Sequence, residues 1–261
     1  MSTIDKIKEL ELLSKKLEPG SELRKEWRDA VSDYAEDFLN NIENINAYVI
    51  TEDKGRALLD APIGEPKNMD FLLDLLRHNV DRPGLNPASG GHLGYIPGGG
   101  IYPSALGDYL ADIFNRYAGM FFGSPGAVRM ENQLIKWLSQ QMGYPESAAG
   151  NLSSGGSIAN QIALCTARDA NNLLSYQIPN AVIYTSAQVH HCVHKAINMV
   201  GLKETVKRNI ALDDRFRMRA DDLKACIIQD VKNGLKPFMV IVSAGTTDVG
   251  AVDPLDEIAD I

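Results

Sequence analysis

Cysteine is scarce in this sequence, and its distribution excludes two common frameworks of small proteins. Cysteine occurs three times in 261 residues, at Cys165, Cys192 and Cys226. An odd number of cysteines without a close pair favours neither a disulfide framework nor a zinc ribbon. Free thiols persist in a reducing compartment, so we expect a cytoplasmic protein.

A long apolar run and an excess of basic residues are also missing. Residues 1–9 interleave charged and apolar side chains, and so lack the continuous apolar core of a signal peptide. The sequence contains no apolar stretch that is long enough to span a membrane. The 26 Lys and Arg residues are outnumbered by 34 Asp and Glu residues, for a formal net charge of -8. Because a nucleic-acid surface needs basic side chains in excess, we expect a small-molecule partner and neither nucleic acid nor membrane.

The N-terminal third carries the pattern of amphipathic helices. Apolar residues recur at helical spacing over residues 4–42, with a break at 19–20 and Ser21 as an N-cap. The same spacing predicts a further helix over 68–79. Such helices must lay their apolar faces on a surface, which can belong to their own domain or to a partner subunit. We assign residues 1–80 to an N-terminal helical segment and expect it to pack on a dimer partner.

Residues 81–261 have a different texture. A dense cluster of glycine and proline fills residues 83–103, and a loop of this length is more often functional than idle. Two helices are predicted next, over 103–117 and 125–142. Strands are then expected near 151–153, 181–185, 204–210 and 238–243, with helices beginning near Ser157, His190 and Asp221. This alternation is typical of βαβ units around a mostly parallel sheet, so the predicted fold class is α/β.

Ligands of open parallel sheets bind beyond the carboxyl ends of the strands, so the loops that follow the predicted strands are candidate site segments. The first such loop places Gly155 and Gly156 between a short strand and an apolar helix. Glycine lets the backbone approach a ligand closely, and the open N–H groups of a helix start attract an anion. Ser157 adds a hydroxyl donor. The turn suits a phosphate, and it equally suits an ordinary glycine turn capped by serine.

The second loop leads into a helix headed by His190. The helical face that should pack on the sheet holds His190, Val193, Ile197 and Val200. The ring of His190, near the strand ends, suits either stacking on a planar cofactor or a structural role. His190 and His194 also have the i, i+4 spacing of zinc ligands, but no third ligand is evident and we expect no metal. We expect His191 and His194 to face solvent.

The third loop follows the predicted strand 238–243 and contains small residues and the hydroxyl pair Thr246 and Thr247. Small residues and hydroxyls suit close approach to a flat ligand and hydrogen bonds to its substituents. Taken alone, the segment could also be only a turn. Asp253 precedes Pro254, which is the pattern of a helix cap with proline at the first helical position.

Taken in order, the three loops resemble those of the pyridoxal-dependent decarboxylases of the aromatic-amino-acid and glutamate decarboxylase group. The resemblance runs from His92 to the last residue. Its further motifs are Gly94-Tyr95-Ile96-Pro97, the segment 102–108, Glu131-Asn132 and Asp253-Pro254-Leu255. It implies the large domain of a type I pyridoxal-phosphate fold, similar to aspartate aminotransferase and with a mostly parallel sheet. It also implies a homodimer.

The resemblance assigns roles to particular residues. Gly156 and Ser157 would bind the phosphate of pyridoxal 5'-phosphate. His190, the catalytic residue of this set, would stack on the ring of the cofactor. Thr247 would hydrogen-bond near the ring oxygen or the substrate carboxylate. Gly98 lies in the loop that would face the substrate, often in the partner subunit's site in this family. This sequence departs there from relatives that have a hydroxyl residue at that position.

The activity implied is the decarboxylation of an amino acid to an amine and carbon dioxide, with the cofactor as electron sink. The family's cofactor-binding lysine and the aspartate that pairs with the pyridinium nitrogen lie beyond the position of Ile261. Leu255, Ile258 and Ile261 begin an amphipathic helix, and we expect the sequence to be a fragment without the C-terminal part of the fold. Two alternatives stay open: an aminotransferase or carbon-sulfur lyase of the same fold, and a non-catalytic homologue.

Overall fold

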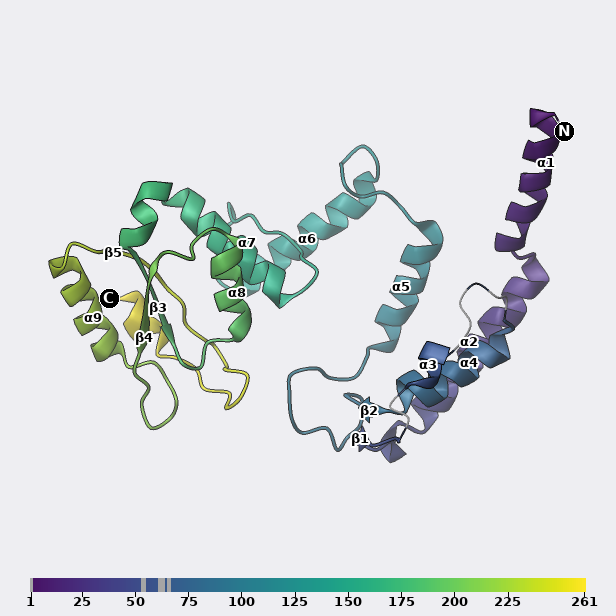
Figure 1. The fold of residues 1–261 in the computed structure, drawn as a ribbon, viewed down its shortest axis with the longest axis horizontal. Helices are drawn as coiled ribbons and strands as arrows, with labels where there is room; N and C mark the ends of the chain where they lie inside the picture. Colours follow the sequence, from purple (N-terminus) through teal and green to yellow (C-terminus); the bar gives the residue numbers. More distant parts are fainter. Residues whose placement is uncertain (1, 53–54, 61–63, 65–66) are drawn as a thin grey trace. The chain divides into compact units, whose positions relative to one another are not determined.

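The chain divides into two compact units, Met1–Asp108 and Tyr109–Ile261 (Figure 1). The division falls inside the helix α5 (Tyr102–Phe114). Among the residues that the computed structural model describes, no helix combines the length and the apolar character that a membrane span requires. The described residues are 2–52, 55–60, 64 and 67–261, and the others all fall within the predicted segment 1–80.

The first unit is mainly helical, as predicted. Its elements are α1 (Thr3–Ser14), η1 (Lys15–Leu17), α2 (Ser21–Asn40), η2 (Ile42–Asn44), β1 (Tyr48–Val49), α3 (Ala57–Asp60), α4 (Met69–Leu76), the π-helix η3 (Arg77–Asp81) and β2 (Gly84–Leu85). The predicted break at 19–20 is confirmed. The predicted N-cap at Ser21 is wrong, because the carbonyl of Gly20 already accepts the first helical hydrogen bond, from the Arg24 N–H.

Many apolar side chains of the first unit are exposed. On α1 the exposed set includes Ile4, Ile7, Leu10 and Leu13. The two short strands β1 and β2 pair antiparallel, with Tyr48 opposite Leu85. Helix α4 begins after Asn68, whose side chain accepts a hydrogen bond from the Phe71 N–H at 2.9 Å. The packing of residues 1–80 on a dimer partner stays a prediction.

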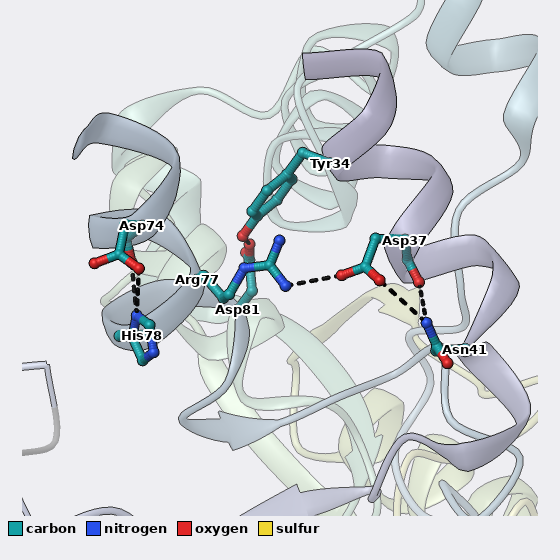
Figure 2. A network of polar contacts seen from close by, with 7 residues as sticks. All are labelled: Tyr34, Asp37, Asn41, Asp74, Arg77, His78 and Asp81. Carbon is teal, nitrogen blue, oxygen red and sulfur yellow. Dashed lines mark hydrogen bonds and ion pairs between the residues drawn. The ribbon is translucent and has the colours of Figure 1, made fainter. Parts of the chain in front are cut away.

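Polar contacts join α2 to η3, the segment that directly follows α4 (Figure 2). The Arg77 guanidinium donates to the Asp37 carboxylate at 2.8 Å and lies 4.8 Å from the centre of the Tyr34 ring. The Tyr34 hydroxyl donates to Asp81. Burial, together with the Asp81 carboxylate, raises the pKa of Tyr34 to about 12. Exposed ion pairs stabilise a fold little, so the main effect of these contacts is on the orientation of α2 relative to η3.

The second unit holds the predicted alternation of strands and helices. After α5 its elements are α6 (Pro125–Gln141), α7 (Gly156–Ala170), η4 (Ser175–Asn180), β3 (Ala181–Ser186), α8 (His191–Met199), β4 (Val206–Ile210), α9 (Ala220–Lys232), β5 (Lys236–Val240) and α10 (Leu255–Ala259). Three of the four predicted strands are confirmed, although β5 starts and ends earlier than predicted. The strand predicted at 151–153 is wrong: this segment is exposed, and no neighbouring strand among the described residues supplies the hydrogen bonds that a strand requires.

The described part of the second unit contains a parallel sheet with the strand order β4–β3–β5. Every residue of β3 is buried. Successive side chains of a strand point to opposite faces, so β3 contributes to two apolar cores. Ala181 and Ile183 pack with α7 and α8 on one face. Val182 and Tyr184 pack with α9 and α10 on the other. The predicted α/β class with a parallel sheet is therefore confirmed.

One carboxylate ties α9 to the sheet. Asp230 is only 2% exposed, and its carboxylate accepts hydrogen bonds from the Tyr184 hydroxyl at 3.0 Å and from the Arg208 guanidinium at 2.6 Å. The hydrogen bonds from Arg208 lower the pKa of Asp230, while burial and then the hydrogen bond to Asp230 raise the pKa of Tyr184. The Asp230 carboxylate thus has hydrogen-bond partners within a mainly apolar core. Breaking the ion pair between Asp230 and Arg208 should therefore lower the stability of the fold, because a buried charge left without its partner is destabilising.

Replacing this carboxylate should destabilise the fold in a pH-dependent way. We expect Asp230→Asn to lower the free energy of unfolding by about 2–4 kcal/mol at neutral pH, and the control Tyr184→Phe by about 1 kcal/mol. A lowered carboxylate pKa stabilises the fold above the unfolded-state pKa, and this contribution disappears as the pH falls through the folded-state pKa. The gap between the protein and Asp230→Asn should therefore narrow in acid. Urea denaturation at several pH values measures it, and a gap that is independent of pH would contradict the assignment.

Candidate active site

The first turn of α7 presents open backbone donors. Gly155, the N-cap, has φ +152°, which residues other than glycine rarely adopt. The first N–H groups of a helix have no partner within it, and no acceptor among the described residues binds those of Gly156 and Ser157. A Cβ built on Gly155 or Gly156 meets no heavy atom within 4 Å. These donors and this open space fit a phosphate group.

His190 is the N-cap of α8. Its Nδ1 accepts a hydrogen bond from the Cys192 N–H at 3.2 Å, so in the neutral ring the proton lies on Nε2. The other members of the predicted stripe, Val193, Ile197 and Val200, are buried in the core, whereas His190 is exposed. His190 thus makes a structural hydrogen bond as the cap of α8 while its ring stays exposed, so the structural role and the stacking role both stay predictions. The helix begins where predicted.

The other histidines of this segment point away from the core. His191 and His194 are exposed, as predicted. The ring of His191 lies 4.1 Å from that of His190, measured between centroids, with the planes tilted by 38°. Within the described part of the chain, no group of three or more His, Cys, Asp or Glu side chains is arranged to hold a metal ion.

The starts of α7 and α8 lie close together. The two helices pack into the same apolar core, on one face of β3 (Figure 1). The amide nitrogen Nδ2 of Asn160 donates to the carbonyl oxygen of Gly156 at 2.9 Å and to Sγ of Cys192 at 3.5 Å. Gly156 and Cys192 thus share one side-chain partner. The fold thereby brings the glycine turn to the helix start that carries His190.

The third loop closes on itself after β5. The Thr246 hydroxyl accepts from the Ala251 N–H at 3.1 Å, and the Thr246 N–H donates to the Ala251 carbonyl at 2.9 Å. Thr246 is buried, so its hydroxyl serves the loop, whereas the neighbouring Thr247 is exposed. Because β3 and β5 are parallel, the loops that carry His190 and Thr247 both leave the sheet at the edge formed by the carboxyl ends of the strands.

Asp253 holds the base of this loop, and its predicted role as a helix cap is wrong. The side chain is 3% exposed. One carboxylate oxygen accepts from the Ser243 N–H and the other from the Met218 N–H, both at 2.7 Å. Helix α10 begins at Leu255 with no side-chain cap. The carboxylate therefore pairs the N–H groups of Ser243 and Met218, and leaving these groups unpaired inside the protein would be costly.

Gly98 belongs to the first unit and is not among the residues that the second unit brings together. A Cβ built on it meets nothing within 4 Å, whereas one built on Gly99 would lie 3.2 Å from Cα of Ala88. Two residues near the site were missed from sequence, Asn160 and Cys192. A side-chain amide four positions after Gly156, one helical turn along α7, was the available signal for Asn160.

Replacing Asp253 distinguishes its role as a buried acceptor of two backbone hydrogen bonds from the role of a helix cap. Asp253→Asn should lower the free energy of unfolding by about 2–3 kcal/mol, because an amide nitrogen would face a backbone N–H inside the core. Asp256→Asn, at an exposed position in the first turn of α10, is the matched control and should cost about 0.5 kcal/mol or less. Urea denaturation of both variants tests this. Equal small effects would return Asp253 to the role of a cap.

The family model described as the pyridoxal-dependent decarboxylase conserved domain matches residues 82–261. An aromatic-L-amino-acid decarboxylase of Bacillus atrophaeus is 35% identical over 222 residues, which are 78% of this chain and 46% of that protein. A histidine decarboxylase of Mus musculus is 33% identical over 219 residues, 76% of this chain and 32% of that protein. The chain thus spans half the length of these relatives or less.

A solved structure supports the same fold. The tryptophan decarboxylase of Catharanthus roseus in complex with L-tryptophan matches with a TM-score of 0.80 and 21% identity, over 93% of this chain and 53% of that one. The predicted large-domain fold is therefore confirmed. With the family match over residues 82–261, the conclusion follows that this chain belongs to the pyridoxal-dependent decarboxylase family.

Proposed function

We propose that the protein containing this chain decarboxylates an amino acid to an amine and carbon dioxide with pyridoxal 5'-phosphate. The observation that carries the proposal is the open pair of N–H groups at the start of α7, joined to the helix start that holds His190. A phosphate and a flat ring need contacts of these two kinds, a short distance apart. Family membership supports the choice of cofactor.

The phosphate would be held by the first turn of α7. The N–H groups of Gly156 and Ser157 and the Ser157 hydroxyl supply donors, and the positive end of the helix dipole favours an anion there. Glycine at positions 155 and 156 keeps side-chain atoms out of the space that the phosphate oxygens need. This turn would anchor one end of the cofactor.

The ring would lie against His190. When bound, the cofactor supplies an electron sink for the bond that breaks between the α-carbon and the carboxylate. The hydrogen bond from the Cys192 N–H fixes the orientation of the His190 ring and keeps its neutral-state proton on Nε2. His190 can therefore pack its face on the ring while Nε2–H donates to a neighbouring oxygen. His190 would thereby position the substrate so that its carboxylate is oriented for cleavage.

The remaining contacts are assigned by the same proposal. The exposed hydroxyl of Thr247, at the same sheet edge, would hydrogen-bond the cofactor ring oxygen or the substrate carboxylate. Gly98 would face the substrate, in a homodimer whose N-terminal helices pack on the partner. The lysine that holds the cofactor and the aspartate that pairs with the pyridinium nitrogen would belong to a part of the protein outside these 261 residues, as the greater length of the relatives allows.

Replacing His190 should impair catalysis severely. We expect His190→Ala to lower kcat by about 100-fold, since the ring that orients the substrate carboxylate is lost. His194→Ala, at an exposed position on the same helix, is the matched control and should retain activity. Carbon dioxide release from aromatic, acidic and basic amino acids by the full-length protein measures both. Unchanged turnover in His190→Ala would remove the residue from the site, and no release from any substrate would overturn the proposed reaction.

Replacing Ser157 should weaken cofactor binding. Ser157→Ala loses one hydrogen bond to a charged group, so we expect the dissociation constant of pyridoxal phosphate to rise about 10- to 100-fold. Thr166→Ala removes an exposed hydroxyl further along α7 and serves as the control. Absorbance titration of the apo protein with the cofactor gives both constants. An unchanged constant for Ser157→Ala would mean that the phosphate binds elsewhere.

A further inference from the structure

We propose that Asn160 is a positioning residue of this site, which fixes the distance between the phosphate-binding turn of α7 and the helix start that carries His190. The inference rests on the proposed function and extends it to a residue that would touch neither cofactor nor substrate. Its basis is a chain of hydrogen bonds that runs from one predicted cofactor contact to the other.

The chain of contacts has three members. The Asn160 Nδ2 donates one hydrogen to the Gly156 carbonyl oxygen at 2.9 Å and directs the other to Cys192 Sγ at 3.5 Å. The backbone N–H of Cys192 donates to His190 Nδ1 at 3.2 Å. An amide NH2 group has two donors, and both are used here. A single side chain therefore spans the gap between the two helix starts.

Cys192 is a fixed point in this arrangement. It is 5% exposed and belongs to the apolar core that α7 and α8 share with β3. Asn160, by contrast, is exposed, so its removal exposes little apolar surface. A thioether or thiol sulfur is a weak acceptor, and the bond to Cys192 adds little to the stability of the fold. Its effect is on geometry: the first turn of α7 cannot shift along α8 without breaking a contact.

Such a spacer matters because the phosphate and the ring belong to one covalent molecule. The separation between the donors of α7 and the ring of His190 must match that molecule. Holding two contacts at the required separation before binding raises affinity by reducing the ordering that binding demands. Losing the spacer should therefore weaken the cofactor complex and loosen the ring against His190, with the fold itself intact.

A matched control lies at the C-terminal cap of the same helix. Asn171 Nδ2 donates to the Ala167 carbonyl oxygen at 2.9 Å, four residues back, as Asn160 does to Gly156. Among the described residues, Asn171 reaches no second helix. Asn171→Ala removes a local bond of the same kind without touching the link between α7 and α8. The difference between the two alanine variants isolates the contact with Cys192.

The test titrates full-length apo protein with pyridoxal phosphate, by absorbance and by circular dichroism of the bound cofactor. We expect Asn160→Ala to raise the dissociation constant about three- to tenfold relative to Asn171→Ala. We also expect a smaller dichroic signal at saturation, with an unchanged melting temperature of the apo protein. Asn160→Gln keeps both donors and should recover part of the affinity and of the signal.

Three results would overturn the inference. Equal constants and equal dichroic signals for the two alanine variants would remove Asn160 from the site while leaving the proposed function in place. A large fall in the melting temperature of Asn160→Ala, not restored by Asn160→Gln, would make the residue structural. Absence of cofactor binding by the unmodified protein would overturn the proposed function, and this inference with it.

Discussion

The burial of one strand on both faces is the constraint on which the second unit depends. Every residue of β3 is buried, so side chains that follow one another along the strand are covered by different helices on its two faces. Ile183 draws α7 and α8 to one face, and Tyr184 draws α9 and α10 to the other. Parallel neighbours on both edges then direct the loops after β3, β4 and β5 to a single edge of the sheet.

The candidate site separates buried support from exposed donors. The side-chain oxygens of Asp253 and Thr246 accept hydrogen bonds from backbone N–H groups that hold the third loop, whereas the Thr247 side chain is exposed. Cys192 plays the same part beneath His190. The groups available to a ligand are the N–H groups of the α7 turn, the His190 ring and the Thr247 hydroxyl, and of these the His190 ring is held by the buried Cys192. A rigid scaffold of this kind suits a cofactor that must be held in one orientation.

Local patterns predicted the elements well, and contacts distant in sequence explain the failures. The apolar run of β3 and the helical stripe of α8 are periodic over several residues, so the parallel α/β fold and the start of α8 could be read directly. Asp253 looked like a cap because Asp-Pro is a local pattern, yet its partners lie 10 and 35 residues away. The link between Asn160 and Cys192 spans 32 residues and has no local signature. The roles of Gly156, Ser157, His190, Thr247 and Gly98 rest on resemblance and stay predictions.

We propose that the start of α7 holds the cofactor phosphate next to His190. A crystal structure of the full-length protein with pyridoxal phosphate tests it most directly. We expect phosphate oxygens within hydrogen-bonding distance of the Gly156 and Ser157 N–H groups, and the His190 ring stacked on the cofactor ring. A phosphate bound away from this turn, or a cofactor ring out of contact with His190, would contradict it.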